Sequence, residues 1–373
     1  MVSIIYNLHL LLLLLQLLLQ VQAENGCSDQ LIYKQEGNIA QAGMHVICAA
    51  PLASGGMFIN GLLNGVTDLT NLEFQHDSGK IEQFIEYMHR IVGTSNNRPA
   101  RKWKAFTTQG SPIFSLDSLL YHRVAIIHTN GLWIWPGVTK GFEQTTFEGV
   151  KLTTLSVSPL VLQAHKFLSM EECDLIQRLA EPHMENSKTS KMDKDVDKPD
   201  TTWRTSTQYF LPSNAHSKIV DIDYRVASLT NTRLEQQEFV QVLRYEKTQQ
   251  YKHHNDYFDI ELYQSDRGVL QMLNGGEMNR LITVFWYLNN VAKGGHTIFP
   301  LANGGGAHAT DSGDCDIPTA LKVQPIKGEV IIFYSLHSDG SLDRSSLHGG
   351  CPVIEGTKWS ANKWIWTASK GLY

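Results

Sequence analysis

Two adjacent histidines, with an aspartate two positions after the second, stand in "YKHHNDYF", residues 251–258. Alternate side chains of a strand share a face, so we expect His254 and Asp256 to project together and His253 to point the other way. An imidazole and a carboxylate on one face can hold a metal ion. The pair alone is weak evidence, because a histidine near an aspartate more often makes a surface hydrogen bond.

The segment "SLHGGCPVIEGTKWSANKWIW", residues 346–366, offers a third ligand in His348, which precedes two glycines. Two histidines and one carboxylate leave positions open on iron(II) for a co-substrate and dioxygen, whereas zinc more usually takes three histidines or two with a glutamate. Lys358 follows ten residues after His348. Buried beside such a site, this lysine would need an anion, which a metal-chelating dicarboxylate would supply. The alternative is a surface lysine lying along a strand.

Four blocks occur in one order: "LRYEKTQQYKHHNDYF", "NRLITVFWYLNNVAKGGHTIFP", "KGEVIIFYSL" and the segment 346–366. Together they resemble the prolyl 4-hydroxylase family of 2-oxoglutarate and iron(II) dependent dioxygenases, from about residue 160 to the end of the chain. The resemblance implies a double-stranded β-helix that hydroxylates peptidyl proline to 4-hydroxyproline. It also implies consumption of dioxygen and 2-oxoglutarate, release of succinate and CO2, and rescue of oxidised iron by L-ascorbate.

The resemblance extends to single residues around the metal. His254, Asp256 and His348 resemble the iron ligands, in favour of the second histidine of the pair. Lys358 resembles the residue that pairs with the distal carboxylate of 2-oxoglutarate. The hydroxyls of two further residues resemble its hydrogen-bonding partners, namely those of Tyr245 and Thr297.

The peptide-binding positions are less regular. Arg280 and Trp364 match positions that contact the substrate peptide, but Trp366 replaces the histidine of the usual "KWIH". Trp366 shares a strand face with Trp364, so we expect it to stack on a proline ring of the peptide; the alternative is that it packs in the core. His296 stands where "GGxT" more commonly holds an acidic or small residue, and no role is assigned to it.

The polar segment 186–202 reads from its composition as a solvated connection, whereas the resemblance implies a loop that closes over the peptide. Five cysteines leave at least one unpaired, and no spacing matches a zinc module. The resemblance and an oxidising compartment predict a disulfide between Cys315 and Cys351; two reduced thiols are the alternative.

The leader "LHLLLLLLQLLLQVQA" predicts a signal peptide over residues 1–23. An uncleaved signal anchor is the alternative and would place the protein at a membrane. Either form puts the body of the chain in the secretory lumen, so we expect localisation in the endoplasmic reticulum and proline-rich or collagen-like peptide substrates. The net charge of -5 and pI near 6.3 disfavour nucleic acid as a partner.

These residues must be held by a fold, which we expect to be mainly β with flanking helices. Residues 160–373 would form a jelly-roll catalytic domain, and residues 24–150 a small α/β region of unknown role. β-branched and aromatic runs predict strands in the former, and Ser169 with Glu172 forms a capping box before a helix. In the latter, residues 81–93 have helical periodicity, and Asn130-Gly131 predicts a hairpin turn.

Two other functions stay open. The first is an oxygenase of the same kind that acts on lysyl residues or a small molecule, which the unexplained N-terminal region and Trp366 favour. The second is a peptide- or carbohydrate-binding module that keeps the fold without catalysis. The intact set of His254, Asp256, His348 and Lys358 argues against the second, because a site without catalysis has no need for all four.

Overall fold

The computed structural model describes residues 42–52, 56–63, 67–75, 79–92, 102–188, 192–193, 197, 203–304 and 313–371. The predicted leader and most of the segment 186–202 lie outside these ranges. No helix within them is both long and apolar enough to cross a membrane. The described chain forms two compact units, the first comprising residues up to Val138 together with Ser338–Gly340, and the second the remainder.

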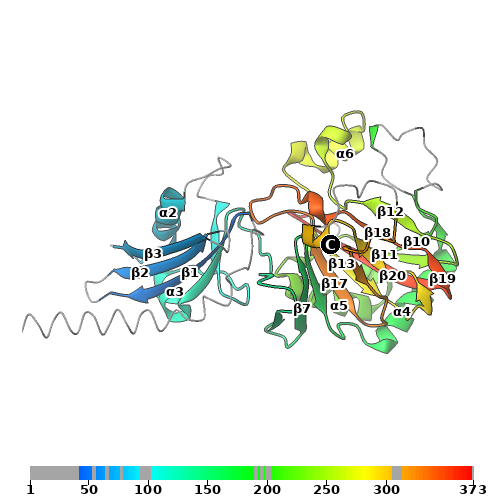
Figure 1. The fold of residues 1–373 in the computed structure, drawn as a ribbon, viewed down its shortest axis with the longest axis horizontal. Coiled ribbons are helices and arrows are strands. Elements are labelled where there is room, and N and C mark those ends of the chain that lie inside the picture. Colours follow the sequence, from blue (N-terminus) through cyan, green and yellow to red (C-terminus); the bar gives the residue numbers. More distant parts are fainter. Residues whose placement is uncertain are drawn as a thin grey trace, which may run out of the picture. The chain divides into compact units, whose positions relative to one another are not determined.

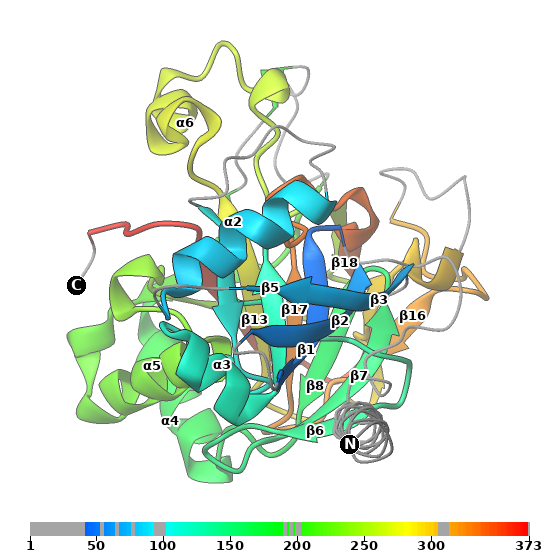
Figure 2. The same ribbon diagram turned by 90° about the vertical axis from the view of Figure 1, so that its left-hand side faces the viewer.

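The first unit is an antiparallel five-stranded sheet in the order β3-β2-β1-β5-β4. Its helices α2 (Ile81–Val92) and α3 (Leu116–His122) pack on one face of the sheet through a shared apolar core, and they are labelled in Figures 1 and 2. The strands are β1 (Met44–Pro51), β2 (Met57–Leu63), β3 (Thr67–Phe74), β4 (Lys104–Phe106) and β5 (Val124–His128). The α/β content and the helix expected over 81–93 are therefore confirmed.

The hairpin expected at Asn130-Gly131 is wrong. β5 pairs with β1 and β4, and residues 132–138 form no strand although Trp133 and Trp135 are buried. The turn is instead held by the late segment Ser338–Gly340. Ser338 bonds the His128 ring through its hydroxyl and accepts from the Asn130 amide at 3.1 Å through its carbonyl oxygen.

The second unit begins at Thr139, and its main sheet has nine strands in the order β6-β7-β8-β17-β13-β20-β11-β10-β9. Their bounds are β6 (Glu143–Thr145), β7 (Lys151–Val157), β8 (Leu160–Ala164), β9 (Glu185–Asn186), β10 (Thr207–Leu211), β11 (Val240–Tyr245), β13 (Arg280–Tyr287), β17 (Val330–Tyr334) and β20 (Lys358–Trp366). The boundary expected near residues 150–160 is therefore wrong, because β6 and β7 extend this sheet.

A smaller sheet has the order β12-β18-β15-β16, with β12 (Tyr251–His254), β15 (Thr297–Phe299), β16 (Leu321–Val323) and β18 (His348–Gly350). β14 (Lys293–Gly294) and β19 (Val353–Glu355) form a separate pair. Phe299 of the small sheet packs in one core with Phe285 and Tyr287 of the main sheet, so the two sheets face each other. This mostly antiparallel sandwich confirms the predicted jelly roll.

Helices cover the opposite face of the main sheet (Figure 1): α4 (Met170–Ala180) and α5 (Ser217–Thr230). The predicted capping box is present, since Ser169 and Glu172 each accept the other's backbone amide. Lys363 of β20 points toward α5, where its amino group lies 2.6 Å from the Asp223 carboxylate. Because side chains alternate, Trp364 on the same strand points into the sandwich.

The remaining helices are short. One is the α-helix α6 (Arg267–Met272). The others are 3-10 helices of three residues each: η3 (Glu181–His183), η6 (Ser213–Ala215), η7 (Leu234–Gln236), η8 (Ile260–Leu262), η9 (Asn274–Gly276), η10 (Ala302–Gly304) and η11 (Arg344–Ser346). Cys315 and Cys351 form the predicted disulfide, with a Cα–Cα distance of 5.9 Å. Cys48 is also disulfide-bonded, and Cys173 is a buried free cysteine.

Candidate metal centre

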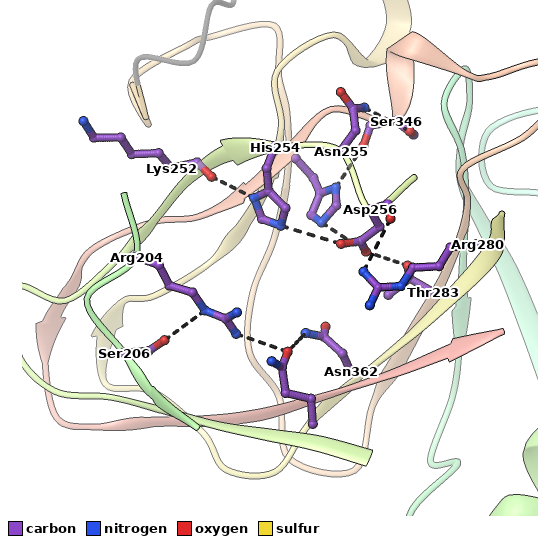
Figure 3. Close-up of polar contacts among 12 residues, drawn as sticks. Arg204, Ser206, Lys252, His254, Asn255, Asp256, Arg280, Thr283, Ser346 and Asn362 are labelled. Carbon is purple, nitrogen blue, oxygen red and sulfur yellow. Dashed lines mark hydrogen bonds and ion pairs between the residues drawn. The ribbon is translucent and has the colours of Figure 1, made fainter. Parts of the chain in front are cut away.

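His254, Asp256 and His348 converge inside the sandwich, as Figure 3 shows for two of them by label. β12 runs antiparallel to β18 with His254 directly opposite His348, and their ring centroids are 4.4 Å apart. The carboxylate of Asp256 lies 3.8 Å from Nε2 of His254 and 3.6 Å from Nε2 of His348. The predicted convergence is present, but its expected cause is wrong: β12 ends at His254, and Asp256 reaches the site from the following turn.

Backbone carbonyls fix both imidazoles. Nδ1 of His254 donates to the carbonyl of Lys252 at 2.8 Å, and Nδ1 of His348 donates to that of Ser346 at 2.9 Å. Each ring therefore presents the lone pair of Nε2 to the centre, in the arrangement typical of metal-bound histidines. Burial and the neighbouring His348 lower the pKa of His254 to about 3.

The carboxylate of Asp256 is held by the hydroxyl of Thr283, which donates to Oδ2 at 2.6 Å. Burial alone would raise the pKa of Asp256, but the two histidines, Arg280 and this hydrogen bond outweigh it and lower the pKa. Neutral imidazoles and an ionised carboxylate are the states that a divalent metal requires. The donor set thus fits iron(II), with coordination positions left for other ligands.

His253 does not belong to this group of ligands. Its side chain is 1% exposed and lies against Gly349, where an added Cβ would come within 2.7 Å of the His253 ring. The glycine after His348 is thus required for close packing of β18 on β12. His253 supports the strand that carries the neighbouring ligand from its other face.

A buried cation and an aromatic ring, both outside the predicted site, flank His254. The ring of Tyr251 stacks on His254 with centroids 3.7 Å apart, and the guanidinium of Arg204 lies 4.6 Å from the Tyr251 ring centroid. Arg204 donates to Ser206 at 3.3 Å, as Figure 3 shows. It also donates to Gln241 at 3.2 Å. Tyr251 lies in the same strand as His254, whereas Arg204 joins the site from a segment remote in sequence and has no motif that marks it.

Lys358 is 2% exposed, which excludes the alternative of a surface lysine. Its amino group lies among three aromatic rings, 5.4 Å from the centroid of Phe285, 5.5 Å from that of Tyr245 and 5.9 Å from that of Tyr287. Burial alone lowers its pKa to about 7, and no carboxylate of the described residues pairs with it. A buried ammonium without a counter-ion is costly, so the pocket favours an anionic ligand.

The two predicted hydroxyl partners of the co-substrate lie around this lysine. Tyr245 is directly opposite Lys358 in the β11–β20 register, and burial raises the pKa of its hydroxyl. Thr297 is buried and accepts a hydrogen bond from the hydroxyl of Tyr287 at 2.9 Å. Thr297 also pairs with Gly350 of the strand that holds His348, which links the lysine pocket to the metal ligands.

Arg280 and Trp364 lie beside the metal ligands. The guanidinium of Arg280 stacks on Trp364 at 3.6 Å from the ring centroid, and one of its nitrogens is 3.5 Å from the carbonyl oxygen of Asp256. Glu238 binds the same guanidinium through both carboxylate oxygens, at 2.8 and 3.2 Å. This ion pair fixes Arg280 at the edge of the metal centre.

The prediction that Trp366 stacks on the substrate is wrong. Trp366 shares a face with Trp364 as expected, but it has no exposed surface and packs with Phe258 and the residues of α6. Its indole N–H donates to Glu238 at 2.6 Å, and the amino group of Lys370 lies 4.0 Å from its ring centroid. These contacts use the whole side chain, so the packing alternative holds.

The chain is similar to known proteins. The family described as the 2OG-Fe(II) oxygenase superfamily matches residues 240–366. "Probable prolyl 4-hydroxylase 10" of Arabidopsis thaliana is 38% identical over 214 residues, which cover 57% of this chain and 70% of the relative. "Prolyl 4-hydroxylase 1" of the same plant is 36% identical over 238 residues, covering 61% and 75%. A viral collagen prolyl hydroxylase from Paramecium Bursaria Chlorella virus-1, solved with 2OG, is 26% identical, covers 56% of this chain and 96% of its own, and has a TM-score of 0.39.

Proposed function

The chain belongs to the prolyl 4-hydroxylase family of 2-oxoglutarate and Fe(II) oxygenases, and from that premise we propose that it hydroxylates prolyl residues of peptides at C4. The observation that supports this activity best is the presence of two buried groups in one domain. One is the His-Asp-His set, which brings two imidazole nitrogens and a carboxylate within reach of one metal ion. The other is Lys358, whose ammonium has no carboxylate partner among the described residues.

In this proposal, His254, Asp256 and His348 hold the iron, and Lys358 holds the distal carboxylate of 2-oxoglutarate. Tyr245 and Thr297 are the hydroxyl groups placed to donate to that carboxylate. When bound, iron and 2-oxoglutarate would supply the oxidising chemistry with dioxygen as the oxidant: one oxygen atom replaces a C–H hydrogen as hydroxyl, and the other enters succinate as CO2 is released. The aromatic walls around Lys358 exclude water, which strengthens the ion pair with the co-substrate.

The peptide would pass the metal beside Arg280. This guanidinium is held by Glu238 and by Trp364, so it can donate to a backbone carbonyl of the peptide without losing its own orientation. Trp364 is 5% exposed, and its ring is largely covered by Arg280. We therefore assign Arg280 to direct contact with the peptide. Trp364 supports Arg280, and the exposed edge of its ring can contact a proline ring of the peptide.

The substrate class and the compartment follow from the sequence and are part of the proposal. The apolar leader directs the chain to the endoplasmic reticulum, where proline-rich or collagen-like secreted chains are available. The disulfide between Cys315 and Cys351 is consistent with an oxidising lumen. L-ascorbate would keep the iron reduced over many turnovers.

The test is an assay of the purified protein with iron(II), 2-oxoglutarate, ascorbate and a panel of proline-rich, collagen-like and lysine-containing peptides. We expect succinate release coupled to the addition of one oxygen atom to proline, assigned to C4 by fragmentation and by comparison with authentic 4-hydroxyproline. His254→Ala serves as the inactive control, and omission of ascorbate should shorten the burst of turnover. Hydroxylation confined to lysine, or succinate release that no peptide stimulates, would refute the prolyl assignment.

A further inference from the structure

His296, Cys315 and Cys351 form a second cluster of metal-ligand side chains, separate from the His-Asp-His set. One nitrogen of His296 and the two sulfur atoms all lie within 4.8 Å of one another. The backbone holds the cluster together, because the amide of Cys351 donates to the carbonyl of His296 at 2.9 Å. Cys351 is 2% exposed, whereas His296 and Cys315 are partly exposed and leave a path for small ions.

The imidazole of His296 has a buried nitrogen, Nε2, without a hydrogen-bond partner among the described residues. Burial, followed by the positive charges of Lys322 and Lys358, lowers the pKa of His296, whereas Asp316 opposes this. The ring is therefore neutral near pH 7, and it can offer a nitrogen lone pair to a metal ion.

We propose that reduction of the Cys315–Cys351 disulfide turns this cluster into a zinc site, with His296 and the two thiolates as ligands. Two cysteines and one histidine make a known zinc set that leaves a fourth position for water. The sulfur atoms must move apart to roughly 3.8 Å, the edge of a tetrahedron with Zn–S bonds of about 2.3 Å. The same two sulfurs cannot bind zinc while they are bonded to each other, so disulfide and metal exclude one another.

Reduction of the Cys315–Cys351 disulfide requires a dithiol reductant. The reductant passes two electrons and two protons to the disulfide and becomes a cyclic disulfide itself, leaving thiols at Cys315 and Cys351. Zinc binding then releases the two thiol protons. Two thiolates neutralise the charge of one Zn²⁺.

The experiment uses the full-length protein carrying His254→Ala, so that the first metal centre is disabled, in oxidised and reduced forms. Titration with Co²⁺ alone is followed by absorption, because Co²⁺ bound to thiolates has a charge-transfer band that oxygen and nitrogen ligands do not give. We expect the reduced protein to bind one Co²⁺ with this band, Zn²⁺ to displace it, and the oxidised protein to show none. Cys315→Ser should abolish the band, and His296→Ala should weaken binding at least tenfold.

Matched controls separate this site from the other thiols. Cys173→Ser and His165→Ala should leave the Co²⁺ affinity unchanged, since neither residue belongs to the cluster. Alkylation followed by peptide mapping gives a second readout: Zn²⁺ should slow the alkylation of Cys315 and Cys351, whereas the slow alkylation of the buried Cys173 should be the same with and without Zn²⁺. No metal uptake on reduction, a band that persists in Cys315→Ser, equal affinity in His296→Ala, or no protection of the two cysteines would each overturn the proposal.

Discussion

Replacement of Lys358 by methionine should stabilise the ligand-free protein, although it removes a residue of the proposed active site. Methionine keeps the apolar stem among the three rings and removes the buried ammonium. The pKa of Lys358 is about 7 in the fold, against 10.5 for an ordinary lysine. Each pKa unit corresponds to about 1.4 kcal/mol, so burial of this lysine costs about 5 kcal/mol in the free energy of unfolding at pH 6.

The sign of the pH dependence follows from proton binding. Between the folded and unfolded pKa values the unfolded chain binds more protons, so the stability of the wild type rises as pH increases from about 7 toward 10.5. At pH 9 the cost of burying Lys358 has fallen to about 2 kcal/mol. The gain in stability of Lys358→Met should therefore be about 5 kcal/mol at pH 6 and about 2 kcal/mol at pH 9, relative to the wild type.

Urea unfolding of both proteins at the two pH values, with a chelator and without 2-oxoglutarate, measures this difference. Lys363→Met is the matched control, because Lys363 is buried on the same strand but paired with Asp223 at 2.6 Å. Its loss leaves a buried carboxylate without its cation and should destabilise the fold by about 3 to 5 kcal/mol. A Lys358→Met variant less stable than the wild type at pH 6, or a gain that does not change with pH, would refute the reasoning.

Four further outcomes are expected. The affinity of the Mn²⁺-loaded protein for 2-oxoglutarate, measured by calorimetry, should fall about tenfold for each pH unit above about 7, because neutral Lys358 must gain a proton to bind the dicarboxylate. The affinity of Lys358→Arg should change little over the same pH range, because arginine stays charged. Thr283→Val should weaken metal affinity about tenfold in equilibrium dialysis, through loss of the 2.6 Å bond to the ligand carboxylate. His254→Ala should lose metal binding and turnover, whereas His253→Ala should keep the metal but lower the melting temperature, since its buried ring supports β18. Trp366→His should lower the melting temperature and depress activity equally on every peptide, by removing about 3 kcal/mol of core packing; a changed peptide preference at unchanged stability would show that the ring meets the substrate.

The sequence predicted the fold and the site best where several residues that take part in the same reaction stand close together in the chain. The four blocks that resemble the prolyl 4-hydroxylase family predicted the jelly roll, whereas the pairing of β12 with β18 is known only from the structure. The disulfide was predicted from the same resemblance and is present. The convergence of His254 and Asp256 was anticipated on the wrong grounds, because strand alternation ignores where β12 ends.

Other features depend on contacts that no local pattern carries. Trp366 is buried by Phe258 and α6, elements whose positions only the tertiary fold determines. Arg204 reaches Tyr251 from a distant segment and has no motif of its own. At the turn where a hairpin was expected, the amide of Asn130 donates to Ser338, more than 200 residues later, and the amide of Thr129 donates to Gly43. A local turn signal cannot anticipate a competitor so far along the chain.

The late segment Ser338–Gly340 has a consequence for the order in which the protein is made. A ribosome delivers the first unit up to Val138 long before it delivers Ser338, yet the amide of Asn130 in the turn after β5 donates to Ser338. Until Ser338 has been synthesised, the ring of His128 in the first unit lacks its contact with the Ser338 hydroxyl. The first unit can therefore complete the hydrogen bonds of this turn only after most of the second unit has been translated.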